Sequence, residues 1–294
     1  MTARPMDIAP ARPVRLPDSG LGSGWEGRAI LGLTLLLLSL GLVTLYSASS
    51  VLAMRQGSPD TYYVLRQAAG AVGGLAAMIG CALTPYKRWE RWSWPLLWVS
   101  VVTLVVIILP GTEAIAPEIN GARRWLQIGI TIQPSDFAKI SVIVWTAAMA
   151  VKKAPHFDSL RNGLGPFFVV WSLVLIPIAL EPDLSTAVLI GILGVMVVFA
   201  AGARIAHFVF LGLLVVPVFL NQLAVGFRQD RIDAYLNPAL DPAGAGFQLR
   251  QSLVALGSGG LTGVGFGEGR QKFGFLPEAH NDFIFAMVGE EGGL

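Results

Sequence analysis

Four short clusters of polar residues stand at the ends of apolar runs, and they hold most of the chemistry that the sequence offers. A bare polar group inside lipid is costly, so ionisable residues in such places are candidates for function. In chain order the clusters are Asn120-Gly-Ala-Arg-Arg-Trp125, Gln133-Pro-Ser-Asp136 with Lys139, Glu181-Pro-Asp-Leu-Ser-Thr186 and Leu276-Pro-Glu-Ala-His-Asn-Asp282-Phe283.

The first cluster combines two cations with an aromatic ring. The guanidinium groups of Arg123 and Arg124 can bind phosphate through paired, charge-assisted hydrogen bonds. Trp125 suits either the lipid head-group level or the face of a sugar. An interfacial anchor explains the cluster equally well, because basic and aromatic residues gather at membrane interfaces in any case.

The second cluster predicts the start of a helix. Pro134 and Ser135 are typical first residues, and Asp136 complements the positive end of the helix dipole. Lys139 lies about one turn into the apolar run, where it needs a partner or must reach the interface. An ion pair with Asp136 is the favoured interpretation, and a contact with substrate is the alternative.

The third cluster places two carboxylates two residues apart. Glu181 and Asp183 could bind a divalent cation, Mg or Mn, together with phosphate oxygens, since hard cations prefer oxygen ligands. The favoured interpretation is simpler, because Pro182 and Asp183 are ordinary residues for the start of a helix.

The fourth cluster brings ionisable groups to the edge of the last apolar run. In a helix Glu278 and Asp282 would share a face, and in an extended segment His280 would line the same side with them. A partly desolvated carboxylate there is disfavoured in its charged form, which suits a general base. When the cluster is taken alone, solvated residues at a helix entry are the favoured interpretation, because acids are common in first turns.

The elements that must position these clusters are apolar helices. Hydrophobic residues make up 54% of the 294 and charged residues 14%, against about 25% charged in an average soluble domain. Since a span needs roughly 20 apolar residues, the sequence predicts an all-α polytopic membrane protein with about seven complete transmembrane helices, and Phe283–Gly289 begins an eighth. The seven runs are Ala29–Met54, Gln67–Tyr86, Trp92–Thr112, Pro134–Val151, Asn162–Leu180, Leu184–Ala203 and Ile205–Phe227.

The remaining segments predict a simple organisation. Residues 1–27 are Pro-rich and polar and are expected to be a flexible cytoplasmic tail without a signal peptide, followed by one multi-span membrane domain over 28–294. Outer loops over 111–133 and 228–282 are long enough to suggest function. Within the second, Leu249, Leu253 and Leu256 have helical spacing, which predicts a short amphipathic helix against the membrane face.

The glycines of Gly257–Gly269 are expected to serve tight turns and close backbone approach rather than phosphate binding.

The end at Leu294 falls inside an element, which suggests a C-terminally truncated chain.

The distribution of cations predicts the orientation in the membrane. With a cytoplasmic N-terminus, the inner short segments hold eleven Lys and Arg, and the outer short loops hold only Arg55, Arg66, Arg123 and Arg124. Cytoplasmic loops are the ones enriched in cations. We therefore expect the N-terminus inside and the four polar clusters on or toward the outer face.

Composition excludes several other classes of protein. A net charge of +2 does not suit a nucleic-acid binder. The lone cysteine, Cys81, allows no internal disulfide, and the three scattered histidines form no cluster with metal-ligand spacing.

Together the four clusters, in this order, resemble the SEDS family (shape, elongation, division and sporulation proteins). The resemblance extends from Tyr46-Ser-Ala-Ser to the Gly-Glu-Glu motif at 289–291, and it is best to the cell-division branch, with the elongation branch second. Asp136 stands where the family usually has Glu, Asn281 stands where Thr is usual, and about three further spans would be expected after the last residue.

The resemblance implies polymerisation of lipid II, an undecaprenyl-diphosphate-linked disaccharide peptide, at the outer face of the bacterial cytoplasmic membrane during division. Asp282 aligns with the family's catalytic aspartate and is expected to be the general base. Arg123 and Arg124 would stabilise the diphosphate, with a divalent cation as a possible aid and no organic cofactor. Residues expected to shape or support the substrate site are Trp125, Lys139, Glu181, Asp183, Glu278 and His280.

The implied partners are a class B penicillin-binding protein transpeptidase and other divisome proteins. Two alternatives to a septal polymerase remain open within the same apolar architecture: a flippase for lipid-linked peptidoglycan precursors, and an elongation-type polymerase. A scaffold that recruits a partner without catalysis is a third.

Overall fold

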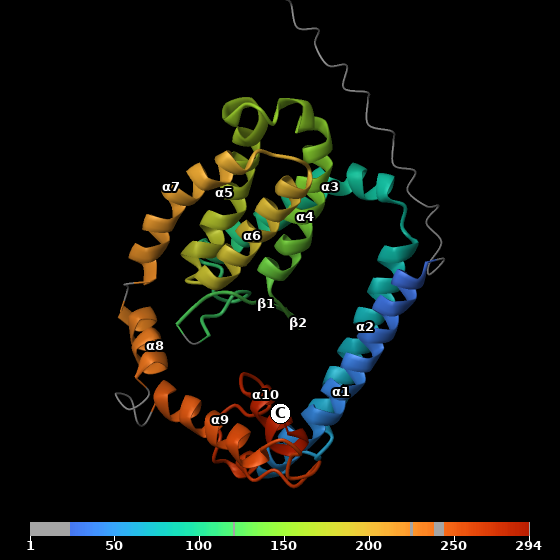
Figure 1. The fold of residues 1–294 in the computed structure, drawn as a ribbon, viewed down its shortest axis with the longest axis vertical. Helices are drawn as coiled ribbons and strands as arrows, with labels where there is room; N and C mark the ends of the chain where they lie inside the picture. Colours follow the sequence, from blue (N-terminus) through green and yellow to red (C-terminus); the bar gives the residue numbers. More distant parts are fainter. Residues whose placement is uncertain (1–23, 120, 224–225, 238–243, 294) are drawn as a thin grey trace, which may run out of the picture. The chain divides into compact units, whose positions relative to one another are not determined.

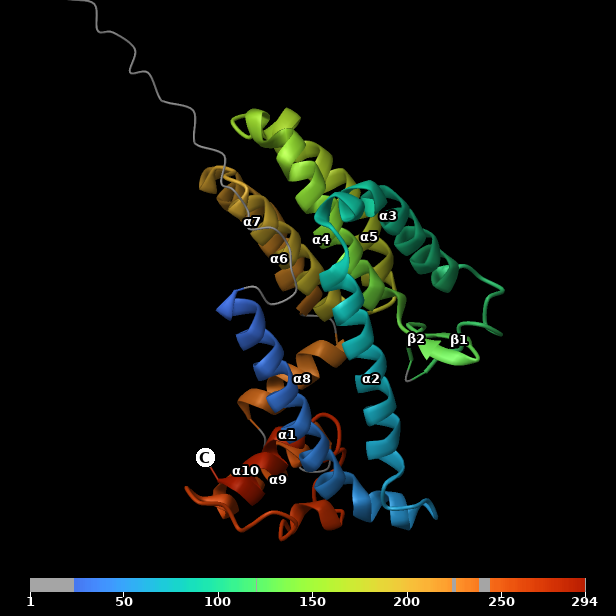
Figure 2. The same cartoon turned by 90° about the vertical axis from the view of Figure 1, so that its right-hand side faces the viewer.

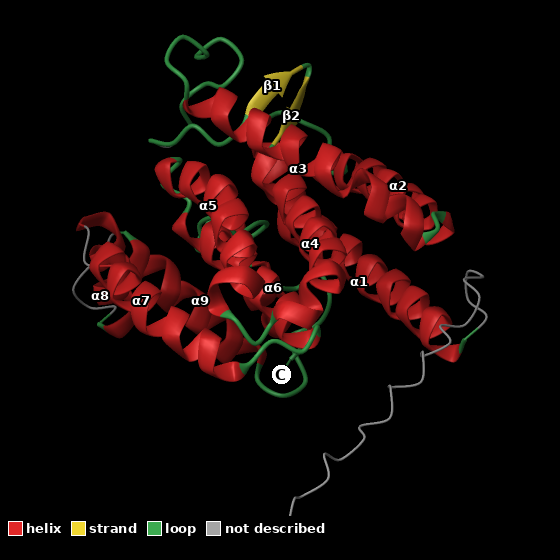
Figure 3. Cartoon of the chain, turned by 90° about the horizontal axis from the view of Figure 1, so that it is seen from above, coloured by secondary structure: helices red, strands yellow, loops and turns green. Residues whose placement is uncertain are grey.

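The computed structural model describes residues 24–119, 121–223, 226–237 and 244–293. Within these ranges the regular structure is mostly helical, with one small antiparallel hairpin (Figures 1 and 3). The chain divides into two compact units, which we call the first unit (residues 1–84 and 226–294) and the second unit (residues 85–225). The predicted tail lies largely outside the described residues.

The first unit combines the beginning of the chain with its last helices. Helices α1 (Trp25–Arg55) and α2 (Tyr62–Leu83) lie side by side (Figure 2). Helix α9 (Ala245–Gly259) packs against α10 (Ile284–Gly292), and α10 also contacts α1. A small core joins these helices to the turn before α10; its buried members are Ala48, Ala255, Leu276, Ala279, Ala286 and Met287.

Glycines let α9 and the following loop approach α10 at backbone distance. A Cβ on Gly259 would collide with the carbonyl oxygen of Gly289. Gly263, with φ +75°, occupies a left-handed conformation, and a Cβ there would collide with the Glu291 carbonyl oxygen. The predicted role of this glycine-rich segment, tight turns and close backbone approach, is therefore confirmed.

The second unit is a helical bundle. Helix α3 (Tyr86–Ile108) packs on α4 (Pro134–Lys153), which packs on α6 (Leu184–Ala200), and α5 (Gly165–Leu180) contacts α3 and α6. A single turn of π-helix, Leu160–Leu164, leads into α5, and α7 (Ile205–Leu223) completes the unit.

Aromatic rings fill the interior of this bundle. Trp145, Phe167 and Trp171 are buried, and successive ring centroids lie 5.7 and 6.0 Å apart. The indole N–H of Trp171 donates to the Thr146 hydroxyl at 3.0 Å, so its one polar atom is satisfied. A Cβ at Gly194 would lie 2.7 Å from the Trp171 ring, and this close approach explains the glycine on α6.

The seven predicted runs correspond to helices α1 to α7. Five segments within the described residues are long and apolar enough to cross a membrane: α1, α2, α3, Leu160–Leu180 and Ile205–Gln222. Helix α6 is apolar but has only 17 residues, and α4 carries acidic and basic residues in its end turns. The all-α polytopic fold is confirmed, whereas the exact number of spans stays a prediction.

The two predicted loops contain more regular structure than expected. Strands β1 (Leu126–Ile128) and β2 (Ile130–Ile132) form a hairpin inside the loop at 111–133. Helix α8 (Gly226–Leu236) lies at the start of the predicted loop at 228–282, where no helix was expected. A run without proline or internal glycine after residue 226 favours a helix there. The amphipathic helix expected around Leu249–Leu256 is confirmed as α9, and its position against the membrane stays a prediction.

Candidate functional site

The turn between α5 and α6 is built by hydrogen bonds from Asp183. Its Oδ1 accepts from the Thr186 backbone N–H at 3.2 Å and from the Ser185 hydroxyl at 3.1 Å, which makes it the N-cap of α6. Its Oδ2 accepts from Gln133 Nε2 at 3.3 Å, which ties the start of α4 to this turn. The predicted helix cap is therefore confirmed.

Arg124 holds the same turn from the other side. Its Nε donates to the Glu181 carbonyl oxygen at 3.1 Å, and its Nη2 donates to the Pro182 carbonyl oxygen at 2.8 Å. Two nitrogens of the guanidinium thus donate to backbone carbonyl oxygens, which fixes the backbone at Glu181 and Pro182. A direct role of Arg124 in phosphate binding stays a prediction, and the structure gives this residue a positioning role as well.

Glu181 is the unusual member of the cluster. It is 2% exposed, and neither carboxylate oxygen has a hydrogen-bond partner within the described part of the chain. Burial raises the pKa of this carboxyl to about 8, the nearby Asp183 carboxylate raises it as well, and Arg124 opposes the shift. The group therefore holds a proton at neutral pH.

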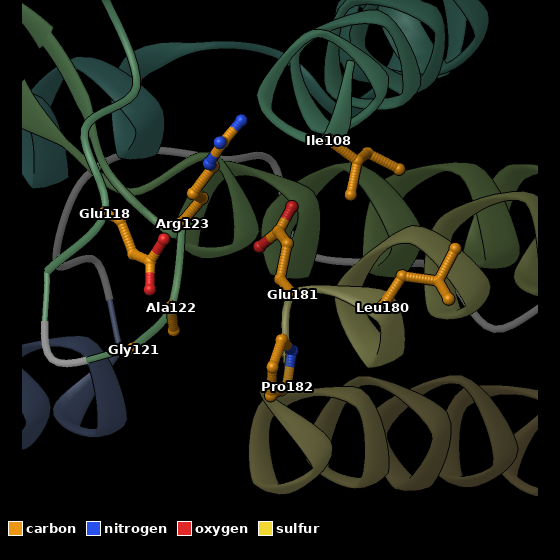
Figure 4. Close-up of a pocket in the computed structure, with 8 residues that line it drawn as sticks. All are labelled: Ile108, Glu118, Gly121, Ala122, Arg123, Leu180, Glu181 and Pro182. Atoms are coloured by element: carbon orange, nitrogen blue, oxygen red, sulfur yellow. The ribbon is translucent and has the colours of Figure 1, made fainter. Parts of the chain in front are cut away.

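A pocket of about 220 Å³ opens in front of Glu181 (Figure 4). Its wall includes the end of α3 at Ile108, the segment that contains Glu118 and Arg123, and the α5–α6 turn. In Figure 4 the Glu181 carboxylate points into the space between Arg123 and Ile108. The pocket thus combines one cation, one buried acid, one exposed acid and an apolar wall.

Arg123 lines this pocket, and its guanidinium forms only a partly exposed ion pair. Its Nη2 lies 3.0 Å from Glu113 Oε1, and the two side chains are 31% and 57% exposed. Exposed ion pairs contribute little, so a phosphate could replace the glutamate. The hairpin places this segment, because the N–H of Gln127 donates to the Ile115 carbonyl oxygen at 2.8 Å and Leu126 is buried. Trp125 is half-buried, and Asn120 lies outside the described residues.

Lys139 forms the ion pair that the sequence favours. Its Nζ lies 2.7 Å from Asp136 Oδ1, in the first turns of α4. The helix begins at Pro134 as predicted. This pairing satisfies the lysine, and its expected part in substrate binding stays a prediction.

The fourth cluster forms a turn in the first unit. Residues 277–283 precede α10 as irregular turns, so Glu278, His280 and Asp282 lie neither in a helix nor in an extended segment. Glu278 has φ +52°, and its carbonyl oxygen accepts from the N–H of Asn281 at 3.0 Å. The left-handed residue reverses the chain, and Asp282 becomes exposed two residues before α10.

The neighbours of Asp282 have partners of their own. Glu278 Oε2 accepts from Asn281 Nδ2 at 3.0 Å, and the His280 ring lies 5.0 Å from the Tyr63 ring. Among the described residues no hydrogen bond or ion pair is found for Asp282, so its carboxylate is accessible for proton transfer.

A buried polar network fixes both ends of this loop, and sequence reasoning missed it. Glu290 Oε1 accepts from the Arg270 N–H at 2.9 Å. Glu291 Oε1 accepts from the Ser47 hydroxyl at 2.6 Å and from Lys272 Nζ at 3.0 Å. Two adjacent carboxylates in an apolar helix were the available signal, since each must find partners when buried.

The structure therefore groups the predicted residues in two sets. Arg123, Arg124, Glu181 and Asp183 meet in the second unit, where Trp125 and Lys139 also lie, and Glu278, His280 and Asp282 belong to the first. The expected proximity of Asp282 to Arg123 and Trp125 stays a prediction.

The described residues do not form a protein cage for a metal ion. Within the described ranges no group of three or more His, Cys, Asp or Glu has suitable geometry. Asp183 uses both oxygens for the turn, and Glu181 is protonated at neutral pH. No catalytic step is therefore assigned to a divalent cation.

Comparison with known proteins identifies the family. The family described as "Cell cycle protein" matches residues 28–294. The chain belongs to the SEDS family. A SEDS relative from Trichlorobacter lovleyi, named probable peptidoglycan glycosyltransferase FtsW, is 37% identical over 286 residues, which cover 96% of this chain and 72% of the relative. Stage V sporulation protein E of Bacillus subtilis is 42% identical over 265 residues, covering 89% and 71%.

A solved structure supports the family's fold for this chain. The solved structure is that of a peptidoglycan synthase complex and is described as showing the structural coordination of polymerization and crosslinking. The match between this chain and that structure has a TM-score of 0.68 at 26% sequence identity. It covers 91% of this chain and 71% of the solved one. The expected membership of the SEDS family, with close similarity to its FtsW members, is confirmed.

Proposed function

We infer that this chain is a peptidoglycan glycosyltransferase that polymerises lipid II during septal cell-wall synthesis. The observation that carries the inference is the match to the FtsW relative over 96% of the chain at 37% identity. The membrane helices and the two polar sites supply surroundings suited to this substrate.

Each part of lipid II finds a matching chemistry in the chain. The polyprenyl tail is apolar, and long stretches of α1, α2 and α7 expose large hydrophobic side chains. The diphosphate is anionic and suits Arg123, whose ion pair with Glu113 is exposed and replaceable. The sugars are polar and require the aqueous edge of the membrane, where the polar clusters end the apolar helices.

The proposed reaction joins two lipid-linked sugars. Asp282 removes the proton from the acceptor hydroxyl, whose oxygen then attacks the anomeric carbon of the donor sugar. The bond between that carbon and the diphosphate oxygen breaks, and polyprenyl diphosphate leaves with the bonding electrons. Arg123, supported by Arg124, stabilises the negative charge that grows on the leaving group.

The buried network around α10 would keep the general base in place. Glu290 and Glu291 bind the backbone and the side chain of residues 269–272, just before the loop that carries Asp282. Because α10 also begins just after Asp282, both ends of the loop are held by the same helix. These groups act as positioning residues and do not touch the reacting atoms.

We also propose the membrane orientation and the partners. The cation distribution supports a multi-pass protein of the cytoplasmic membrane with its N-terminus inside and the active site on the outer face. The solved synthase complex, which couples polymerization and crosslinking, supports a class B penicillin-binding protein as partner. Other divisome proteins are expected partners, and a divalent cation remains an expectation.

The test uses purified chain in liposomes with labelled lipid II as the only substrate. The wild type should form glycan strands, and Asp282→Asn should lower the rate by about 10²- to 10⁴-fold, the usual contribution of positioned proton transfer. Asp158→Asn, an exposed aspartate paired with Arg204 on the surface, serves as the matched control and should retain activity.

Two outcomes would overturn the proposal. Strand formation by Asp282→Asn at the wild-type rate would remove the proposed base. Movement of label across the liposome membrane without joining of sugars would favour the flippase instead.

A further inference from the structure

The Glu181 pocket contains a carboxylate that the local architecture does not use. The α5–α6 turn is already held by Arg124 through two carbonyl oxygens and by the Asp183 cap. Only the backbone of Glu181 takes part in these contacts. Its side chain is nonetheless almost fully buried, with both oxygens unpartnered and directed into the pocket (Figure 4). A buried polar group without a partner is costly, so a ligand that satisfies it would be favoured.

The charged groups around Glu181, together with its burial, determine the protonation state of its carboxyl. Arg123 and Glu118 stand in the pocket wall, Asp183 follows two residues later, and Arg124 holds the turn. Helix α3 contributes the apolar Ile108, and the residue before α4 is the neutral Gln133, which binds Asp183. Burial together with Asp183 raises the pKa of Glu181 to about 8 in spite of Arg124. At neutral pH the group is therefore a hydrogen-bond donor.

A neutral acid beside a guanidinium selects for an anionic oxygen. The guanidinium supplies charge, and the carboxylic acid supplies an O–H donor, so both attract the same oxyanion. An ionised glutamate in this place would repel it. The volume of about 220 Å³ is below the range of about 300–1,000 Å³ typical of pockets for whole small ligands, which suits a phosphate-sized group better than a disaccharide.

We propose that Glu181, in its neutral form, donates a hydrogen bond to a phosphate oxygen of the lipid-linked diphosphate, with Arg123 as the cationic partner. The identity of the ligand rests on the proposed function, whereas the preference for a phosphate rests on the pocket. Glu181 thereby acts as a proton-dependent specificity residue, and ionisation of its carboxyl opposes binding.

The proposal predicts a particular dependence on pH. The neutral fraction of a group with a pKa of about 8 falls about tenfold between pH 7 and pH 9. The affinity for a diphosphodiester, whose own charge does not change in this range, should fall by a similar factor. Glu181→Gln carries an N–H donor that does not titrate, so its affinity should be nearly constant over the same range.

The experiment measures binding of a polyprenyl diphosphate that carries a single sugar, which lacks the acceptor sugar needed for polymerisation. Wild type, Glu181→Gln and Glu181→Leu are compared in detergent at pH 7 and pH 9, with polyprenol as the phosphate-free probe. Glu181→Leu should bind about ten- to a hundredfold more weakly than wild type at pH 7, the usual effect of a lost hydrogen bond to a charged group. Arg123→Ala should weaken binding and keep the pH dependence.

The outcomes separate this proposal from the proposed function. Equal affinity of the wild type at both pH values, or the same fall in Glu181→Gln, would overturn the role of Glu181. Binding of polyprenol as tight as that of the diphosphate would overturn the phosphate assignment. Lipid II polymerisation, measured in parallel on the wild type, tests the catalytic function independently of either result.

Discussion

Glu291 in the first unit and Glu181 in the second are both almost completely buried, at 3% and 2% exposure, but their carboxylates have different surroundings. Glu291 accepts from the Ser47 hydroxyl and from Lys272, whose side chain is 6% exposed. Glu181 has no partner for either oxygen within the described residues and faces a pocket. Nearly equal burial therefore serves two different purposes.

The difference separates a structural acid from a candidate binding group. A buried charge with a cation and several hydrogen bonds is compensated and holds segments together. A buried acid without partners keeps its proton and leaves a donor available to a ligand. The exposed fraction alone does not distinguish a structural acid from a candidate binding group, whereas the hydrogen-bond and ion-pair partners of the carboxylate do.

Breaking the compensated pair should have the largest effect. Lys272→Met leaves Glu291 buried without its cation, and the free energy of unfolding should fall by about 3–5 kcal/mol. Denaturation in detergent measures the loss. Lys152→Met, which removes an exposed pair with Glu90 at 3.3 Å, is the control and should cost less than about 1 kcal/mol. A loss for Lys272→Met as small as that of the control would contradict the structural role of Glu291.

The buried, unpartnered carboxyl of Glu181 should make the free energy of unfolding depend on pH. The pKa of Glu181 is about 8 in the folded chain and 4.5 as the ordinary value, so the folded state binds the proton more tightly. The free energy of unfolding should therefore decrease as pH rises from about 4.5 to about 8 and level off above that range.

Glu181→Gln should remove this decrease, since the amide does not titrate. Melting temperatures of the two proteins at several pH values measure the effect, and Glu118→Gln, an exposed residue of the same pocket, is the control. An identical pH slope for wild type and Glu181→Gln would show that the carboxyl titrates normally.

An exposed pair should have the smallest effect. Lys139→Met removes the 2.7 Å ion pair with Asp136, whose side chain is 62% exposed, and should cost about 0.2–0.5 kcal/mol. The same denaturation assay applies, with Asp136→Asn as the matched variant on the other partner. A loss above about 2 kcal/mol would place Lys139 with Glu291 among the compensated buried charges.

The sequence predicted the features that depend on near neighbours. Apolar runs gave the helices, because hydropathy and helix length are local properties. The start of α4 at Pro134, the Asp183 cap and the pairing of Lys139 with Asp136 were likewise predictable, since each involves groups within three residues of one another.

The turn that carries Asp282 was not predictable from periodicity. The spacing of Glu278, His280 and Asp282 fits either a helix or an extended segment, but Glu278 takes a left-handed conformation that interrupts both. Residues other than glycine rarely adopt this conformation, so surrounding contacts must stabilise it. The burial of Leu276 and Ala279 against α9 and α10 supplies those contacts.

The sequence by itself determined the class of protein, its apolar helices and the residues able to carry charge. Only the tertiary structure decided which of these charges are satisfied. Arg124 reaches carbonyl oxygens 57 and 58 residues away, and Ser47 reaches Glu291 across 244 residues. A hydrogen bond depends on the distance between two groups in space and not on their separation along the chain. Tertiary packing therefore decides whether a buried carboxylate has a partner.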